Sequence, residues 1–549
     1  MAKNKAPLHP DAPLLLNNHR RPVTRRELIA QGFKAGSATV IGGSMLGLFA
    51  PSAFGELSPE LILKRAQCGI RSEGAGKIPF ICFDLAGGAN IAGSNVLIGQ
   101  KGGQLDFLST GGYSKQGLPA DMAPNASQAP NALLYDTSLG LAFHADSALL
   151  RGIKARTSLM TQGMTNGAVI AARSENDTGN NPHNPMYGIA KAGADGSLMT
   201  LIGSVNSDSG GNSMSPSTMI NLEMRPTKVD RPEDVSGLVD VGDLATLMPT
   251  KKDIVEVMES IYKISDAKIA NVSPGTLVAG RDEELKEMIR CSYVQGAEIA
   301  DKFGTPGSLT VEGDEDILGG DGVPGIFTMA EFTTGPGSGE YRKTASVMKL
   351  VMNGYAGAGT ITMGGFDYHT GDRSTGEIRD ERAGNCIGAC LEYAARLGKP
   401  LMIYVYSDGS VFSNGMIDNS AAGGGKGVWT GDDQQTGAAF FLVYNPGNRP
   451  VLIGGTGSDP ATITAAQRVH QQLGYMRASG DVETASSPAA NNVNLLVETV
   501  LLNYMALHGE QGKFGTTFAG HGLGNSTLQD KMTAFQPLSS IVNGLIPVT

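Results

Sequence analysis

Three kinds of feature are scarce in this sequence, and each scarcity excludes a class of protein. The five cysteines form no Cys-x-x-Cys pair, which argues against zinc ribbons, dithiol redox sites and covalently attached haem. Neither Gly-x-Ser-x-Gly nor Gly-x-x-x-x-Gly-Lys-Ser/Thr occurs, which disfavours a conventional serine hydrolase and a P-loop enzyme. Basic residues are also few, because residues 56–549 carry 36 Lys or Arg against 51 Asp or Glu. We therefore expect no nucleic acid partner, since a phosphate backbone needs a basic surface.

The composition is that of a large globular protein with many loops. Of the 549 residues, 41% are hydrophobic and 17% are charged, which is enough apolar surface for a large core. The 75 glycines follow no collagen-like period, so we expect short elements joined by glycine-rich connections. Five cysteines allow at most two disulfides. Cys386 and Cys390 lie one helical turn apart on an apolar face, which favours buried free thiols there.

The first 55 residues are predicted to be an export signal. Arg25 and Arg26 precede a mildly apolar run at 33–49, and small residues follow it, which fits cleavage after Gly55. This order is typical of a twin-arginine signal, so we expect the twin-arginine translocase as a partner and a periplasmic or secreted location. The apolar run is too short and glycine-rich for a stable membrane span, and we expect none in the mature chain. The alternative is an amphipathic N-terminal helix.

Alternating strand and helix patterns predict an α/β fold. Apolar runs that end in glycine or in a polar loop predict buried strands, and apolar residues at helical spacing predict amphipathic helices. A strand, helix, strand succession needs a right-handed crossover, so we expect a mostly parallel central sheet flanked by helices. The strands are expected at 77–85, 157–161, 359–363, 401–406 and 438–444, and the helices at 149–153, 378–397, 461–473 and 493–508.

Residues 56–549 are predicted to form one domain that carries an insertion. From about 205 to 343 the composition changes to turn residues, two helical patterns at 251–271 and 282–303, and an acidic glycine-rich loop. We expect this stretch to be a helical and loop insertion, or a cap, rather than part of the core.

The predicted site is built around residues 364–372, Gly-Gly-Phe-Asp-Tyr-His-Thr-Gly-Asp. This stretch follows a predicted strand and precedes a long helix, so it lies at a strand's carboxyl end, where open α/β sheets bind ligands. Asp367 and His369 are two residues apart, so on extended backbone their side chains point the same way and suit a divalent cation. The alternative is a glycine-rich turn in which an aspartate caps the next helix and His369 bonds to main chain.

Other predicted strand ends supply further acids. Asp84 ends the first strand, Asp408 follows the strand at 401–406, and Asp432 and Asp433 stand in a glycine-rich loop. If these strands are neighbours, the carboxylates crowd one edge of the sheet and repel one another unless a cation lies among them. The sequence therefore predicts a divalent metal site at that edge, with the ligands Asp367, His369, Asp432, Asp433, Asp84 and Asn90.

Six short motifs stand in the order of a known family. They are Gly-Gly-Ala-Asn at 87–90, Leu-Ala-Phe-His at 141–144, Pro-His at 182–183, Gly-Gly-Phe-Asp-Tyr-His at 364–369, Ser-Asp-Gly at 407–409 and Thr-Gly-Asp-Asp at 430–433. Over residues 77–510, and in the signal, the chain resembles the family called domain of unknown function 1501, which comprises twin-arginine-exported bacterial proteins. The resemblance implies the fold of the alkaline phosphatase and sulfatase superfamily and metal-dependent chemistry on phosphate or sulfate esters.

The chain departs from this family's pattern at three positions. Asn90 stands where the family has its first acid, Asp408-Gly409-Ser410 replaces Glu-Phe-Gly, and Asp433 replaces a histidine. A site with less imidazole leans from zinc towards manganese, magnesium or calcium, and the identity of the ion stays open. The arginine that follows Glu-Phe-Gly in the family is also missing, which removes a bidentate clamp for an oxyanion.

Two functions remain open from the sequence. The first is an exported metal-dependent hydrolase of a small-molecule ester, with a degenerate metal site, in which the resemblance implies that Ser94 attacks the substrate. The alternative role of Ser94 is that of an ordinary turn serine. The second function is a catalytically inactive exported binding or structural protein on the same scaffold.

Three more residues are predicted to lie near the site as substrate-binding or supporting groups. His183 is in a polar loop after the second predicted strand, and Asp408 is at the end of the strand at 401–406. His144 precedes a predicted helix, and we expect it to pack against that helix.

Overall fold

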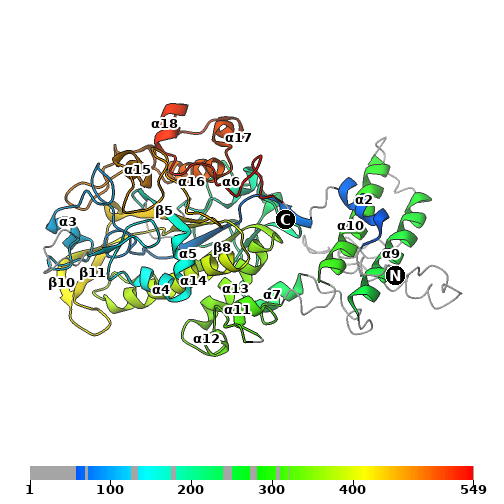
Figure 1. The fold of residues 1–549 in the computed structure, drawn as a ribbon, viewed down its shortest axis with the longest axis horizontal. Coiled ribbons are helices and arrows are strands. Elements are labelled where there is room, and N and C mark those ends of the chain that lie inside the picture. The colour runs from blue at the N-terminus through cyan, green and yellow to red at the C-terminus, as the bar shows by residue number, and fades with distance from the viewer. Residues whose placement is uncertain are drawn as a thin grey trace, which may run out of the picture. The chain divides into compact units, whose positions relative to one another are not determined.

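The chain divides into two compact units in the computed structural model. Unit 1 takes Met1–Ile70 and Val241–Thr305, and unit 2 takes Arg71–Asp240 and Pro306–Thr549. Figure 1 labels many of the elements of the two units. The predicted export signal at 1–55 lies outside the described residues. These are 57–68, 72–124, 134–174, 181–238, 250–272, 281–303, 310–320 and 322–547.

Unit 2 is built on an eight-stranded sheet with the strand order β13-β5-β12-β9-β2-β8-β6-β7. Neighbouring strands are parallel except at β12, which runs antiparallel to both β5 and β9. The predicted α/β fold with a mostly parallel sheet is confirmed. The strands are β2 (Phe80–Leu85), β5 (Thr165–Ala171), β6 (Met199–Gly203), β7 (Thr227–Lys228), β8 (Ala356–Met363), β9 (Leu401–Tyr406), β12 (Ala438–Tyr444) and β13 (Gln472–Leu473).

Helices cover both faces of this sheet, as Figure 1 shows. Side chains alternate along each strand, so Phe80 and Cys82 of β2 face one side and join a core cluster with residues of α6 and α16. On the other side, a Cβ atom at Gly359 of β8 would touch Val347 and Val351 of α13. The helices are α6 (Met186–Lys191), α15 (Ala465–Gln471) and α16 (Val493–Leu507) on the first face, and α4 (Ala148–Arg156), α13 (Ser338–Met352) and α14 (Ser374–Arg396) on the second.

Most predicted elements are present, with one strand misplaced. The strands expected at 77–85 and 359–363 are β2 and β8, and the later two are β9 and β12. The strand expected at 157–161 is wrong, because this stretch enters the short helix α5 (Leu159–Gly163) and the strand follows it as β5. The Ser158 side chain accepts a hydrogen bond from the backbone N–H of Thr161, and this cap starts a helix instead.

A two-stranded hairpin accompanies the sheet and carries part of the predicted site. In it β10 (Val411–Asp418) pairs antiparallel with β11 (Lys426–Asp432), so the predicted glycine-rich loop at 430–432 is wrong. The other elements of unit 2 are β1 (Ser72–Ala75), β3 (Tyr135–Asp136), β4 (Phe143–His144), α3 (Thr110–Lys115), α7 (Pro232–Gly237), α11 (Glu315–Leu318), α12 (Met329–Thr333), α17 (Phe514–Thr517) and α18 (Ser526–Lys531), with the 3-10 helices η1 (Leu222–Met224), η3 (Gln434–Thr436), η4 (Pro488–Asn491) and η5 (Gln511–Lys513).

Within the stretch predicted as an insertion, at 205–343, only Val241–Thr305 belongs to unit 1. Its flanks belong to unit 2, where β7 pairs with β6 at the sheet's edge and α13 packs on β8. The prediction included these flanks in the insertion for two reasons. The strand β7 has only two residues and lies among turn residues, so no periodic pattern indicates it, and α13 follows a glycine-rich loop.

Unit 1 consists of the helices α2 (Pro59–Gln67), α9 (Lys251–Ala270) and α10 (Arg281–Phe303) in its described part. A disulfide joins Cys68, just after α2, to Cys291 in α10. The thiols of Cys386 and Cys390 in unit 2 are free and buried, as predicted. The buried core of unit 1 is Leu57, Leu61, Ile254, Val255, Tyr262, Val294, Ala297 and Ala300.

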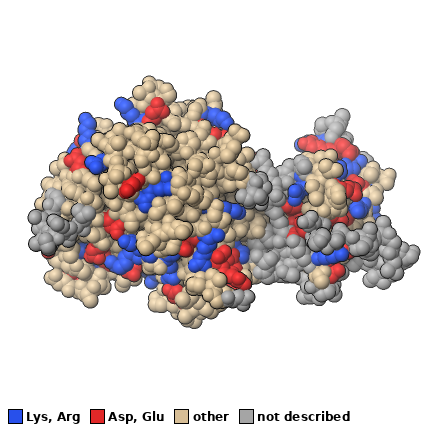
Figure 2. Space-filling view, viewed as in Figure 1, with Lys and Arg blue, Asp and Glu red and all other residues tan. Residues whose placement is uncertain are grey.

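Charged side chains of both signs are interspersed on the face of unit 2 seen in Figure 2. Several charged side chains of unit 2 form ion pairs, such as Arg151 with Glu381 and Arg156 with Glu331. None of the described helices combines the length and the apolar composition that a membrane-spanning helix needs.

Candidate functional site

Three neighbouring parallel strands bring the predicted loops to one edge of the sheet. β2 lies between β8 and β9, so the carboxyl ends of all three meet there. The backbone N–H of Gly87 donates to Asp408 Oδ1 at 2.8 Å. A Cβ atom at Gly87, where φ is +119°, would lie 2.6 Å from the backbone N of Asp367. The predicted meeting of these loops is therefore confirmed, and we call this edge the rim: residues 85–90, 364–372 and 407–410, with Asp432.

An imidazole between two carboxylates is the exposed part of the rim. His369 Nε2 lies 2.6 Å from Asp367 Oδ1, and its Nδ1 lies 3.8 Å from Asp432 Oδ1. The side chains of Asp367, His369 and Asp432 are 63%, 30% and 45% exposed. We call these three residues the rim triad. The two carboxylates lie nearest to different nitrogens of the ring, and the three side chains do not converge as ligands around one point.

Asp84 is buried at the end of β2, and its carboxylate is held by a loop from elsewhere in the chain. Its Oδ2 accepts hydrogen bonds from the backbone N–H groups of Asn212 and Ser213 at 2.7 and 2.8 Å. Its Oδ1 accepts a third bond from the Ser213 hydroxyl at 3.1 Å. Burial, with a smaller repulsion from Asp408, raises the pKa of Asp84 to about 7. This carboxyl serves as an anchor for residues 212–213.

Asp408 has the same role on the neighbouring strand. It is fully buried, with Oδ1 accepting from Gly87 and Oδ2 accepting from the Asn212 side-chain amide at 3.1 Å. Its main-chain carbonyl accepts from the side chain of Asn181 at 2.8 Å. Asn212, which is itself exposed, therefore binds Asp84 through its backbone and Asp408 through its side chain, and it connects the two buried acids.

Asn90 and Ser94 are paired inside the protein. The Asn90 side-chain amide donates to Ser94 Oγ, and the Asn90 backbone N–H donates to the hydroxyl of Tyr368 at 2.8 Å. Ser94 is 1% exposed. This placement fits the alternative of a structural turn serine, and the attacking role of Ser94 stays a prediction.

Asp433 is turned away from the rim triad. Its carboxylate lies 2.6 Å from Lys115 Nζ, and its Oδ1 accepts from the backbone N–H of Gln435 at the start of η3. Consecutive residues on extended backbone point to opposite sides, so Asp432 and Asp433 cannot both face His369. The prediction of Asp433 as a partner of Asp367 and His369 is wrong for this reason.

The two predicted histidines outside the rim differ from each other. His144 Nε2 is 2.8 Å from the carbonyl of Met122, and its Nδ1 accepts the backbone N–H of Asp146. Burial lowers the pKa of His144, which is a main-chain-bonded structural histidine. The ring of His183 stacks on Tyr406 at 5.8 Å and 5°. Neither nitrogen of His183 has a hydrogen-bond partner among the described residues, and burial lowers its pKa to about 3.

The rim residues do not fit a dedicated metal centre. The oxygens of Asp84 and Asp408 already accept protein hydrogen bonds, Asp433 pairs with Lys115, and the rim triad does not converge. In the described part of the chain, three metal-binding side chains converge in one place, at Cys68, Glu287 and Cys291 of unit 1. Cys68 and Cys291 are joined in a disulfide there. The predicted metal ligands therefore come together only as the triad, without the geometry of a cation site.

A buried charged network beneath the rim was missed by the sequence analysis. Glu377 accepts from Arg373 Nη2 at 2.6 Å and from Lys426 Nζ at 2.8 Å. The Arg373 guanidinium lies 4.5 Å from the ring centre of Trp429, the only tryptophan. Burial and the nearby Glu377 raise the pKa of Asp380 to about 7. The signal was present, because residues 373, 377 and 380 form a charged stripe at helical spacing where α14 begins.

Comparisons with family models, with curated proteins and with solved structures found no match to this chain. The resemblance to domain of unknown function 1501 and to the alkaline phosphatase and sulfatase superfamily stays a prediction. Any statement of function therefore depends on the geometry of the site itself.

Proposed function

We propose that this protein is an exported ligand-binding protein on an α/β scaffold of hydrolase type, without an ester-hydrolysing centre. One observation carries the proposal: both buried acids at the strand ends are held by hydrogen bonds from the protein. A carboxylate that gives up such bonds to ligate a cation loses about 1.5–3 kcal/mol for each charge-assisted bond. Asp84 and Asp408 therefore stabilise the fold of the rim, and their oxygens are already engaged in hydrogen bonds rather than available to a metal ion.

The rim triad is the part of the site that remains open to a ligand. It places two carboxylates at the surface, one from the loop after β8 and one from the end of β11. An exposed pair of carboxylates favours a ligand that carries positive charge, such as an amine, a guanidinium group or a hydrated cation. Arg379 donates to the carbonyl of Gly364, so a positive charge stands at one end of the same loop.

Trp429 connects the two sides of this open region. Its carbonyl accepts the backbone N–H of Gly371 at 2.8 Å, so β11 is bonded to the loop that holds Asp367 and His369. Its indole is buried and packs against Arg373 at the start of α14. Ligand binding that moves the hairpin against the rim loop will change the surroundings of this indole.

Export supports a binding role outside the cytoplasm. The twin-arginine pattern at 20–26 is the basis of this part of the proposal, with the translocase as the partner and a periplasmic or secreted location. The Cys68–Cys291 disulfide supports it, because disulfides persist mainly in oxidising compartments.

A metal-dependent ester hydrolase is the second candidate function. The observation in its favour is that Asp367, His369 and Asp432 lie side by side at the carboxyl edge of a parallel sheet. In this candidate a divalent ion, Mn, Mg, Ca or Zn, would be held by these three side chains and would activate a nucleophile on a phosphate or sulfate ester.

Metal analysis and ester hydrolysis separate the two candidates. We expect the purified mature protein to contain no stoichiometric metal and to hydrolyse neither aryl phosphate nor aryl sulfate in the presence of each of the four cations. Hydrolysis that depends on an added cation, and that is lost in Asp367→Ala/His369→Ala, would establish the second candidate instead.

Trp429 fluorescence tests the binding role directly. We expect a saturable change in its emission with a linear polyamine, and loss of that change in Asp367→Asn. Asp418→Asn is the matched control, because Asp418 lies on the same hairpin but at the end opposite to Asp432. If no cationic probe changes the emission, or if both variants respond equally, the rim triad is not the binding site.

A further inference from the structure

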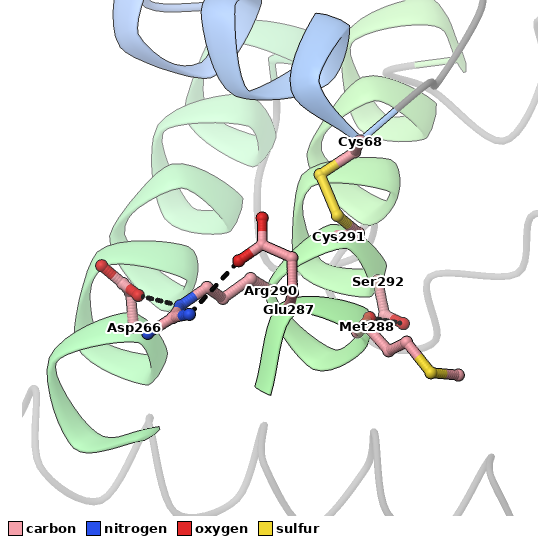
Figure 3. Close-up of a disulfide and its surroundings, with 7 residues drawn as sticks. All are labelled: Cys68, Asp266, Glu287, Met288, Arg290, Cys291 and Ser292. Atoms are coloured by element: carbon pink, nitrogen blue, oxygen red, sulfur yellow. Dashed lines mark hydrogen bonds and ion pairs between the residues drawn. A yellow bond between two sulfur atoms is a disulfide. The ribbon is translucent and has the colours of Figure 1, made fainter. Parts of the chain in front are cut away.

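The disulfide of unit 1 lies beside a carboxylate that has no part in the rim. Figure 3 shows Cys68 at the end of α2, Cys291 in α10 and Glu287 one turn earlier on α10. Residues four apart on a helix project from the same face, so Glu287 and Cys291 lie next to each other. One oxygen of Glu287 and the two sulfurs are all within 4.8 Å of one another.

Glu287 is held in this position by a cation on the same helix. Arg290 Nη1 lies 3.2 Å from Glu287 Oε2, and the same guanidinium binds Asp266 at 2.6 Å and Glu283 at 2.9 Å. Figure 3 shows the bonds to Glu287 and Asp266. A carboxylate fixed in this way is oriented before any ligand arrives, which lowers the entropy cost of binding.

We propose that Cys68, Glu287 and Cys291 form a metal site that opens when the disulfide is reduced. The predicted metal ion is zinc, because thiolates and carboxylates are zinc ligands. Two thiolates, one carboxylate and a water molecule would complete a tetrahedral site. The group is reachable, since Cys68 and Cys291 are partly exposed and Glu287 is on the surface. Cys68 and α10 are then joined by a covalent bond in the oxidised protein and by a metal ion in the reduced protein.

The reaction is a thiol–disulfide exchange followed by metal binding. A dithiol reductant transfers two electrons and two protons, the bond between the two sulfurs breaks, and the reductant becomes a disulfide. The two new thiols release their protons to solvent when their sulfurs bind the zinc ion. Oxidation by a protein or small-molecule disulfide reverses the sequence, so the two sulfurs bond again and the zinc ion leaves.

The three other cysteines do not compete for the ion. Cys82, Cys386 and Cys390 are buried, and each lies in unit 2. Burial raises the pKa of the thiols of Cys82 and Cys386 to about 12, so neither forms a thiolate near neutral pH. A metal–thiolate signal from the reduced full chain therefore reports Cys68 and Cys291.

Cobalt titration of the full-length protein tests this inference. The protein is reduced with a phosphine, freed of excess reductant without oxygen, and titrated with Co²⁺, whose bond to thiolate gives a charge-transfer band in the near ultraviolet. We expect one Co²⁺ per chain in the reduced protein, displacement by Zn²⁺, and no band in the oxidised protein. No band after reduction, or an equal band in Cys68→Ser/Cys291→Ser, would overturn the proposal.

Glu287→Gln and Glu283→Gln form a matched pair that keeps both thiols. Both glutamates bind Arg290, but only Glu287 is near the sulfurs. We expect Glu287→Gln to weaken Co²⁺ binding by about tenfold or more, which is typical for loss of a supporting oxygen, and Glu283→Gln to change it by less than about twofold. Equal effects in the two variants contradict a role for Glu287 as a ligand. Circular dichroism before each titration shows whether the helices of a variant are intact.

Discussion

The two units of this protein are stabilised in different ways. In its described part, unit 1 packs three helices around a cluster of eight buried apolar side chains, and a disulfide joins Cys68, just after α2, to Cys291 in α10. Unit 2 buries both faces of an eight-stranded sheet and also buries several acids, among them Asp84, Asp380 and Asp408. The described apolar cluster of unit 1 is small, and a covalent link adds to the stability that such a cluster supplies, whereas unit 2 has enough apolar burial to carry polar groups inside it.

Removal of the disulfide is expected to have the largest effect, and it should be confined to unit 1. Cys68 and Cys291 are 223 residues apart, but much of that chain stays folded in unit 2 when unit 1 opens alone. The effective loop is therefore shorter, and we expect Cys68→Ser/Cys291→Ser to lower the stability of unit 1 by about 3–4 kcal/mol. Hydrogen exchange should show lost protection in α2, α9 and α10 only. Equal loss in β2 and β8 would mean that the two units unfold together.

Asp408→Ala should give the largest loss in unit 2 among single changes at the rim. The change leaves the N–H of Gly87 and the amide of Asn212 without their acceptor. Both hydrogen bonds are part-buried and their acceptor is charged, so we expect their loss to cost about 2–3 kcal/mol of the free energy of unfolding, measured with denaturant. The pKa of Asp84 should fall as well, because repulsion from Asp408 is one cause of its rise.

Asp408→Asn is the control for that change. It removes the charge but keeps one acceptor oxygen, so we expect a smaller loss of stability than in Asp408→Ala, with a similar fall in the pKa of Asp84. A fall of equal size in stability for both variants would assign the role of Asp408 to its charge rather than to its hydrogen bonds.

His183→Phe is expected to stabilise unit 2, in contrast to the two changes above. A phenyl ring keeps the stack on Tyr406 and removes two buried nitrogens that have no partner among the described residues. We expect the free energy of unfolding to rise by about 1–2 kcal/mol at pH 7. A fall instead would mean that the imidazole binds a group that becomes unpaired in the variant.

The same residue gives a pH dependence with a definite sign. Burial lowers the pKa of His183 to about 3 in the folded chain, below the usual value near 6.5 of the unfolded chain. The unfolded state therefore binds a proton that the folded state does not, and stability is lost as pH falls from about 6.5 towards 3. His183→Phe should lose less stability over this range than the unchanged protein, measured by denaturant unfolding at a series of pH values.

The meeting of the rim loops could be predicted from the sequence, but the roles of their side chains could not. The apolar runs of β2, β8 and β9 place Asp84, Asp367 and Asp408 at strand ends, and the sequence predicts that they meet at one edge on the condition that these strands are neighbours, which the strand order fulfils. The partners of Asp84 come from residues 212–213, which are 128 and 129 residues away, and no local pattern indicates that pairing. An acid at a strand end is compatible with a metal ligand and with a structural anchor, and only the position of the hydrogen-bond donors decides between them.

The misplacement of Asp433 had a different cause. A glycine-rich segment was taken as a loop, although Trp429 and its neighbours form β11 against β10. Once that hairpin is known, alternation along the strand places Asp432 towards His369 and Asp433 towards Lys115. The error was to miss the strand periodicity of this segment. Recognising that residues 411–413 pair with 429–432 would have corrected it.

His369→Gln should change stability least and binding most. The rim triad is exposed, and exposed ion pairs contribute about 0–1 kcal/mol, so the free energy of unfolding should change by less than about 1 kcal/mol. Without the imidazole between them, Asp367 and Asp432 lose the group that sets their separation, and the response of Trp429 to a cationic probe should weaken. Asp408→Ala should have the opposite effects, a large loss of stability and little change in binding, because Asp408 is not part of the exposed triad. A stability loss in His369→Gln as large as in Asp408→Ala would show that the triad, like the buried acids, serves mainly to hold the rim together.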